Sequence, residues 1–429
     1  MDAGYPIHDT RLDNGLRVIV SPDQLAPVVA VNLWYDVGSR HEEPGRTGFA
    51  HLFEHLMFQG SAHVESGQHI ALMQSAGASV NATTWFDRTN YFEALPTGGL
   101  ELALWLEADR MAHLLDALGQ ENLDNQREVV KEEKRQRYDN VPYGDVMERL
   151  VALTFPADHP YGHTTIGSMA DLDAASLDYV HHFFRTHYLP NNCVLTLAGD
   201  VTPERGLALA ERYFGHIPAG KLPPPPPEPD LGPIAGVPRE ETSAPVPADA
   251  AYFSWRLPPL GTRAIDAVDL ALSILGGTQT SRLHRALVRE AELAVNAGSS
   301  ALQLIGGHSF GFASARARDG VALAAVEDAM VAELARFAED GPTEEEVRRA
   351  HAQFERGWLQ AMARLETRAD QISAAATLLD DPNRINTRVD EVGDIGAEEI
   401  RDAAAAYLAP DQRATLLYRQ QAAEVEETR

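Results

Sequence analysis

Two histidines and a glutamate stand close together in the segment Gly48-Phe-Ala-His-Leu-Phe-Glu-His-Leu-Met57. His51 and His55 are four residues apart, so on a helix both imidazoles project from one face and can converge on one metal ion. Glu54 lies beside that face, where it can contact a metal-bound water without ligating the metal. Zinc held by imidazoles and one carboxylate keeps an open position and lowers the pKa of bound water to about 7. The spacing predicts zinc-dependent hydrolysis with Glu54 as general base.

A third protein ligand is expected from the glutamate-rich segment Gln126-Arg-Glu-Val-Val-Lys-Glu-Glu133. On a helix, Glu133 lies four residues after Val129 and three after Val130, so it continues their apolar stripe towards the core. Glu132 lies one residue round from that stripe, which indicates a solvated charge. We therefore choose Glu133 as the third ligand and keep Glu132 as the alternative.

A largely buried helix is predicted to position the histidines, between Thr47 as its N-cap and Gly60 as its terminator. Its apolar residues are Phe49, Leu52, Phe53, Leu56, Met57 and Phe58. The alternative interpretation is a helix with ordinary buried histidines and a salt-bridged glutamate. Since uncompensated polar groups are costly in an apolar helix, a metal site is favoured. A second spaced pair, His159 and His163, is predicted to be two surface histidines, because a proline and a glycine between them indicate a loop.

Composition argues against several classes of function. The 63 acidic residues exceed the 36 basic ones and give a net charge of −27, which disfavours nucleic acid and anionic membranes as partners. Cys193 is the only cysteine and stands in an apolar run, so we expect a buried hydrophobe, with no disulfide framework. No apolar stretch reaches the roughly 18 residues of a membrane span, and no signal peptide is apparent. We expect a cytoplasmic protein of bacterial origin, or a periplasmic or secreted one if a presequence was removed.

The chain is expected to form two domains, because 429 residues exceed the roughly 250–300 at which one hydrophobic core stops growing. Residues 218–247 are rich in proline, with five in succession at 223–227, and predict an extended linker. The predicted domains are therefore residues 1–217, which carry the metal motif, and residues 248–429, which carry none.

Strands and helices follow a similar order in the two predicted domains. In the first, strands are predicted at residues 28–35, 80–84, 89–95 and 193–198, and long helices at residues 98–118 and 121–138. In the second, the predictions are strands at residues 251–257, within 298–315 and at 414–418, and helices at residues 264–275, 281–292 and from 321 onward. This order predicts an α+β fold of two similar domains.

The sequence resembles the pitrilysin and insulin-degrading-enzyme family, specifically its smaller members related to the mitochondrial processing peptidase, known as M16. The metal motif has the His-x-x-Glu-His order of inverted zincins. The supporting segments are Leu12-Asp-Asn-Gly-Leu-Arg-Val18, Trp34-Tyr-Asp-Val-Gly-Ser39, Asn81-Ala-Thr-Thr84, Thr89-Asn-Tyr91 and Tyr188-Leu-Pro-Asn-Asn192. The family's glutamate ligand follows its second histidine at nearly the spacing that separates His55 from Glu133.

The resemblance implies two α/β-roll domains of the LuxS/MPP-like metallohydrolase fold, with one zinc ion per chain. It implies a zinc metalloendopeptidase that cleaves peptides or short unfolded polypeptides inside a chamber of four such domains. Since one chain supplies two domains, a homodimer or a heterodimer with a related subunit is expected. The peptide substrate would be held as an added strand near Asn81 and the segment Ala82 to Thr84, with Ala82 and Thr83 among the contacts; for Asn81, an ordinary turn or strand-end asparagine is the alternative.

Two departures from the family pattern affect these expectations. Gln126 stands where many members carry a second glutamate, and it can hydrogen-bond but cannot be an anion. Arg282 matches an arginine that grips substrate, but Val295 stands where a tyrosine is common. The missing tyrosine suggests that this chain is the zinc-bearing subunit of a heterodimer whose partner holds the substrate. The alternatives are a non-catalytic structural or assembly subunit, which usually loses ligands that this chain retains, and a different zinc hydrolase.

Overall fold

The computed structural model describes residues 4–421, and the chain divides into two compact units. Unit 1 takes the residues up to Glu132, Thr164–Pro226 and Arg356–Val389. Unit 2 takes Glu133–His163, Pro227–Glu355 and the residues from Asp390 on. These units differ from the contiguous domains predicted at 1–217 and 248–429, because each unit includes a segment from the other half of the sequence.

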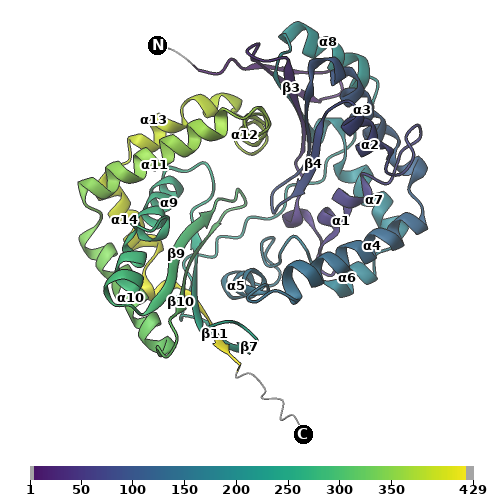
Figure 1. Ribbon diagram of the computed structural model, residues 1–429. Helices are drawn as coiled ribbons and strands as arrows, with labels where there is room; N and C mark the ends of the chain where they lie inside the picture. Colours follow the sequence, from purple (N-terminus) through teal and green to yellow (C-terminus); the bar gives the residue numbers. More distant parts are fainter. Residues whose placement is uncertain (1–3, 422–429) are drawn as a thin grey trace. The chain divides into compact units, whose positions relative to one another are not determined.

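Unit 1 is built on a six-stranded sheet with the strand order β1-β2-β6-β3-β5-β4 (Figure 1). Its strands are β1 (His8–Arg11), β2 (Arg17–Pro22), β3 (Val28–Tyr35), β4 (Ser79–Thr84), β5 (Thr89–Pro96) and β6 (Cys193–Gly199). β2 and β6 run parallel, and every other neighbouring pair is antiparallel. β4 therefore lies at one edge of the sheet.

Helices cover both faces of this sheet. They are α1 (Phe49–Leu56), α2 (Gln68–Ser75), α3 (Leu100–Ala117), α6 (Met169–Asp173), α7 (Leu177–His187), α8 (Pro203–Phe214) and α12 (Leu365–Leu378). Since successive side chains of a strand face opposite ways, Ala30 and Trp34 of β3 pack in clusters with residues of α12. α3 contacts β3 and lies on the other side of it (Figure 1). Burial on both faces explains why every residue of β3 except Asn32 is apolar or aromatic, and Asn32 is buried too.

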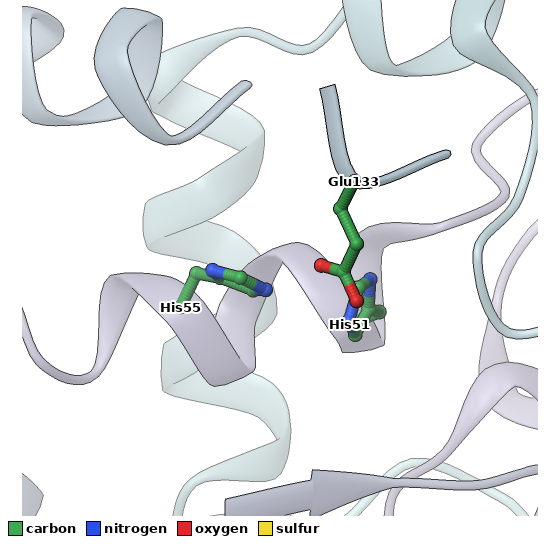
Figure 2. A group of neighbouring side chains, drawn as sticks. All are labelled: His51, His55 and Glu133. Carbon is green, nitrogen blue, oxygen red and sulfur yellow. The ribbon is translucent and has the colours of Figure 1, made fainter. Parts of the chain in front are cut away.

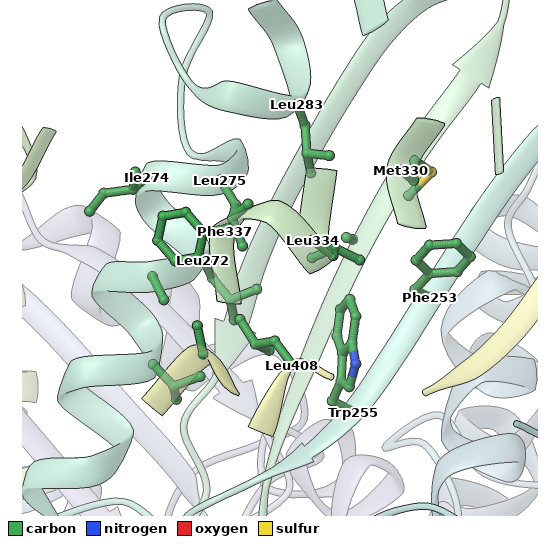
Figure 3. Close-up of a cluster of buried hydrophobic side chains, with 14 of the residues drawn as sticks. Phe253, Trp255, Leu272, Ile274, Leu275, Leu283, Met330, Leu334, Phe337 and Leu408 are labelled. Carbon is green, nitrogen blue, oxygen red and sulfur yellow. The ribbon is translucent and has the colours of Figure 1, made fainter. Parts of the chain in front are cut away.

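Unit 2 is built on a five-stranded sheet with the order β7-β11-β8-β10-β9. Its strands are β7 (Arg239–Ala244), β8 (Ala250–Leu257), β9 (Ala294–Leu302), β10 (Ser309–Ala317) and β11 (Ala414–Gln420). Its helices are α5 (Val146–Thr154), α9 (Arg263–Gly276), α10 (Leu323–Asp340) and α14 (Ala397–Tyr407). Residues of α9, α10 and α14 pack on β8 and β10 in one buried cluster that includes Trp255, Leu272 and Phe337 (Figure 3).

The two sheets repeat one topology, which confirms the predicted fold class. Each has one parallel pair, β2 with β6 and β7 with β11, followed by three antiparallel strands. The units also exchange helices along the sequence. α5, from the first half of the chain, packs on β8 and β11 of unit 2, whereas α12, from the second half, packs on β3 and β6 of unit 1. Helices α4 (Gln120–Lys134), α11 (Glu344–Met362) and α13 (Arg388–Gly393) contain the boundaries between units.

Most predicted strands lie within a residue or two of the observed ones, but the linker and two helices differ. Within the predicted linker, Arg239–Ala244 forms β7 beside β11, because this stretch contains no proline and alternates in exposure. The predicted helix at residues 281–292 is a π-helical stretch, His284–Glu290. The helix predicted at residues 121–138 ends at Lys134 and continues as a π-helical turn, Arg135–Asp139. Among residues 4–421, no helix combines the length and apolar character that a membrane crossing requires.

Candidate metal centre

Helix α1 carries the histidine pair, and its first turn is fixed by two carboxylates. Thr47 was predicted as the N-cap, but its N–H and hydroxyl instead both donate to Asp171, at 2.9 and 2.7 Å. Gly48 occupies the cap position with a φ of 89°, which favours glycine. The Glu42 carboxylate accepts from the N–H groups of Gly48 and Ala50, at 2.9 and 2.7 Å. A negative charge at a helix N-terminus stabilises it, so Glu42 replaces the predicted cap.

The apolar side of α1 packs against α7. The Phe53 ring lies 5.3 Å from the ring of Phe183 and 4.9 Å from that of Tyr188, centroid to centroid. The ring of Phe49 lies edge-on to Tyr179, at 4.7 Å. Aromatic contacts of this kind fix the rotation of the helix about its axis. The histidines and Glu54 are therefore held on the half-buried side.

His51, His55 and Glu133 converge as a potential metal site (Figure 2). Each offers one ligand atom, and these atoms lie within 4.8 Å of one another. The two imidazole rings are 4.9 Å apart, centroid to centroid, and nearly perpendicular at 87°. Two nitrogen ligands and one carboxylate, all half-buried, match the donor set of a catalytic zinc site that keeps a position open for water. These residues fit a zinc ion.

Glu133 reaches the histidines from the last turn of α4, which the short helix α6 holds in place. Arg127 of α4 donates from Nε to the Leu172 carbonyl and from Nη2 to the Ala175 carbonyl, both at 2.8 Å. Lys131 pairs with Asp173 at 2.9 Å. Since α6 also supplies the carboxylate that binds the start of α1, the same short helix contacts both elements that carry ligands.

The row of buried residues along α4 differs in part from the row that the sequence predicts. Leu123, Gln126 and Val130 are buried, and Glu133 continues their row half-buried. Val129, which the sequence argument included in the stripe, is 41% exposed. The structure places Gln126 on the ligand side of the helix, two turns before Glu133. Arg137, one turn later, donates to Glu133 Oε1 at 2.5 Å. Glu132 is exposed, whereas Glu133 belongs to the group of candidate ligands with His51 and His55.

Glu54 extends from α1 towards the edge strand β4. The hydroxyl of Thr84, the last residue of β4, donates to Glu54 Oε2 at 2.6 Å. Two buried tyrosines, Tyr91 and Tyr188, lie close behind, with their hydroxyls 3.2 Å apart. Burial raises the pKa of both, and the charge of Glu54 adds to the effect. Glu54 therefore lies beside the candidate metal ligands, and its Oε2 accepts a hydrogen bond from Thr84.

The residues predicted to meet substrate lie together on β4. Asn81 is exposed, and its side-chain oxygen accepts from the N–H of Ala82 at 2.9 Å. The Ala82 side chain is buried. The Thr83 hydroxyl donates to Asn90 at 2.6 Å and accepts from Arg88. Of the three, Asn81 presents a polar side chain at the surface.

Arg282 was predicted to grip substrate, but it is a buried ion-pair residue of unit 2. Its guanidinium donates to both oxygens of Glu346, at 2.9 and 2.7 Å, and to the Gly341 carbonyl. It also lies 4.8 Å above the ring of Phe337. Glu346 is too distant in sequence for spacing to reveal this pairing. These contacts argue against the substrate role, since freeing the guanidinium would leave a buried carboxylate unpaired.

The second histidine pair lies in a loop, as predicted, but His159 is buried. Its ring stacks on Phe155 at 4.9 Å, and its Nδ1 accepts from the N–H of Tyr161. Burial lowers the pKa of His159 to about 4, with the charges of His308 and Arg256 adding to the shift. The prediction of a surface histidine was wrong because the aromatic neighbours cover it. Cys193 is buried as predicted, and burial raises the pKa of its thiol.

A buried polar cluster in unit 1 was missed by sequence reasoning. His69, Glu93 and Glu107 offer ligand atoms within 4.8 Å of one another. Arg110 binds Glu107 through Nε, at 2.9 Å, and Nη2, and it lies 4.3 Å above the ring of Tyr91. The available signal was the Glu107–Arg110 spacing within an apolar helix. Because Arg110 binds both oxygens of Glu107, the cluster is poorly suited to a metal ion.

The charge balance of this cluster requires one proton. Burial lowers the pKa of His69 and the nearby Arg110 charge lowers it further, which favours the neutral imidazole. If Glu93 and Glu107 were both ionised, the positive charge of Arg110 would balance only one of them and the cluster would keep one net negative charge. Burial opposes the ionisation of Glu107, but Arg110 holds its pKa below the ordinary value, whereas burial and Glu107 raise the pKa of Glu93. The folded protein therefore favours the protonated form of Glu93 over that of Glu107.

Comparison with known proteins identifies the family. The insulinase profile, peptidase family M16, matches residues 17–168, and the profile of the peptidase M16 inactive domain matches residues 174–354. The zinc protease PqqE of Helicobacter pylori is 30% identical over 311 residues, which cover 70% of this chain and 68% of that protein. The chain belongs to peptidase family M16. An uncharacterized zinc protease of Rickettsia bellii is 26% identical over 365 residues, 85% of each chain.

Solved structures share the M16 fold along nearly the whole chain. The crystal structure of a protease from Helicobacter pylori aligns with a TM-score of 0.90 at 25% identity, covering 97% of this chain and all of that one. The peptidase M16 inactive domain from Pseudomonas fluorescens aligns with a TM-score of 0.87 at 16% identity, which bears on the fold alone. Relatives named zinc proteases support a zinc-dependent peptidase. The candidate ligands all lie within the region matched by the first profile.

We predict that Glu133→Gln weakens zinc binding at least about 100-fold, since even outer partners of a metal ligand contribute 10–100-fold. Competition with a chromophoric chelator measures the affinity. Glu132→Gln, one residue earlier on the exposed side of α4, is the matched control and should bind zinc within about threefold of wild type. Equal losses in the two variants would contradict the choice of Glu133.

We predict that Glu93→Gln gains stability relative to wild type as pH rises. The unfolded chain releases the Glu93 proton near the ordinary pKa, whereas the folded protein keeps it until the raised pKa. Wild-type stability therefore decreases with pH in this window, and a neutral amide removes that dependence. Urea unfolding between about pH 5 and pH 8 measures the difference between variant and wild type. Glu101→Gln, on the exposed part of α3, is the control; a Glu93→Gln difference as flat as the control's would count against the buried proton.

Proposed function

We propose that this chain is a zinc-dependent endopeptidase that cleaves peptides or short unfolded polypeptides, with one zinc ion per chain. The observation that carries the proposal is the convergence of His51, His55 and Glu133 beside Glu54 in a member of family M16. A non-catalytic assembly role is disfavoured, because it would not need four polar groups kept together on and beside an apolar helix.

The chemistry follows from the positions of these side chains. Zinc held by the two imidazoles and Glu133 would polarise a scissile carbonyl and lower the pKa of a water molecule. Glu54, one residue before a ligand and half-buried, takes the proton of the attacking water on its carboxylate. It then donates that proton to the departing amine, which cannot leave as an anion. Glu54 therefore acts first as a base and then as an acid.

The edge strand β4 is suited to hold an extended peptide. The N–H of Trp85 donates to the Arg88 carbonyl and closes the β4–β5 hairpin. Because ladder bonds alternate along an antiparallel pair, the backbone groups of Val80, Ala82 and Thr84 point away from β5, to the unpaired edge. A substrate strand added there is bound through its backbone, which tolerates many sequences. Ala82 thereby belongs to the proposed binding edge, and Asn81, whose side-chain oxygen accepts from the Ala82 N–H, lies beside it.

We further propose that the chain works as a dimer, with a related M16 subunit that completes the chamber. Arg282 is engaged by Glu346, and Val295 is an exposed apolar residue on β9, so neither supplies the expected arginine and tyrosine. A partner subunit that carries this arginine and tyrosine would supply the missing substrate contacts.

The Glu54→Gln variant tests the catalytic role directly. We expect zinc affinity close to wild type but peptidase activity reduced about 100-fold or more, the scale of losing a general base. Cleavage of an unstructured fluorogenic peptide and zinc content are measured on the same preparations. Chelation should abolish wild-type activity, and added zinc should restore it. Equal activity in the two proteins would rule out Glu54 as the base.

Size-exclusion chromatography with light scattering, followed by the peptidase assay, tests the proposed assembly. We expect the purified chain alone to cleave peptide weakly and to become more active when a related subunit is added. Robust turnover by a homodimer of this chain would overturn the heterodimer proposal while leaving the catalytic site intact.

A further inference from the structure

Thr84 connects the edge strand to the proposed base. It is the last residue of β4, and its hydroxyl donates to Glu54 Oε2 at 2.6 Å. A hydroxyl–carboxylate hydrogen bond of this length is charge-assisted and stronger than one between neutral groups. Both side chains are half-buried, so water competes less for this hydrogen bond than it would at an exposed surface.

The backbone around Thr84 is fixed on both sides. The N–H of Trp85 donates to the Arg88 carbonyl at 2.8 Å, and the carbonyl of Trp85 accepts from the N–H of Ser39 at 3.2 Å. Thr89, the cross-strand partner of Thr84, donates its own hydroxyl to the Val37 carbonyl. A β-branched side chain is also restricted about χ1. The Thr84 hydroxyl is therefore a rigid donor.

Glu54, in contrast, has three side-chain torsions. A glutamate loses rotamer freedom when it is held in one conformation, so an ordered carboxylate requires a specific contact. The other hydroxyl contacts of β4 point elsewhere: Ser79 donates to Glu366 of α12, and Thr83 donates to Asn90 of β5. Alternation along the strand sends the side chain of Thr84 to the face that meets α1.

We propose that Thr84 is a positioning residue that sets the orientation of the Glu54 carboxylate relative to the substrate strand. This proposal rests on the proposed peptidase function. Thr84 contacts both the substrate strand and the base: its backbone lies at the edge of β4 that would bind the peptide, and its hydroxyl donates to Glu54. The distance between base and scissile bond is thereby set by the covalent geometry of a single threonine. Thr84 itself does not touch the reacting atoms.

Thr84→Val tests the proposal, because it removes the hydroxyl and keeps the shape and the backbone. We expect kcat to fall about 10- to 100-fold, the scale of a base displaced by up to about 1 Å, while KM and zinc affinity stay within about threefold of wild type. Thr84→Ser retains the donor and should restore most of kcat. Thr97→Val, which removes a threonine hydroxyl from its contact with the Asp200 carboxylate beyond the end of β5, is the control and should keep the wild-type kcat. A Thr84→Val enzyme with wild-type kcat would overturn the proposal.

A crystallographic comparison supplies a readout that does not depend on peptidase activity. In wild type and Thr84→Ser, the Glu54 carboxylate should adopt one orientation with an oxygen within hydrogen-bond distance of residue 84. In Thr84→Val it should rotate away or occupy several conformers. An unchanged, single orientation in Thr84→Val would overturn the proposal even if the wild-type protein cleaves no peptide. The proposed function fails separately, if wild type and Glu54→Gln show the same activity in the presence of zinc.

Discussion

The candidate metal centre depends on α6, a helix of five residues that contacts α4 and the start of α1. Its Asp171 carboxylate binds Thr47 at the start of α1, while the Leu172 carbonyl and Asp173 bind α4. The ligands come from positions far apart in the chain, and imidazole and carboxylate atoms must meet within a fraction of an ångström to hold one ion. The polar contacts of α6 position the start of α1 and the end of α4 relative to each other more directly than packing across the sheet would.

The surroundings of α1 show how a short helix can carry three polar side chains. Eight residues are too few to form a stable helix alone. Glu42 satisfies the first backbone donors, the ring of Phe53 packs on α7, and Thr84 contacts the polar side. Each contact restrains a different degree of freedom: the end of the helix, its rotation, and the conformation of one side chain. The polar face therefore remains ordered although it contributes little burial of its own.

The site could be predicted from sequence where local periodicity determines geometry. The four-residue spacing placed His51 and His55 on one face, and the row through Val130 placed Glu133 towards them. Features that depend on distant residues could not be predicted. The pairing of Arg282 with Glu346, the exchange of α5 and α12, and the proximity of Glu93 to Glu107 each join segments whose separation has no periodic signature. The sequence predicted that strands and helices follow a similar order along both halves of the chain, but not the order of the strands within each sheet.

The exchange of helices has a consequence for how the chain is made. One face of β3 meets α12, and the indole of Trp34 bonds Asp370, which follows 336 residues later. At a synthesis rate of about 5–20 residues per second, the ribosome needs on the order of twenty seconds or more to deliver that partner. Throughout this interval the nascent first half exposes an apolar sheet face. The packing of the unit 1 sheet is therefore complete only after α12, which comes from the second half of the chain, has been synthesised.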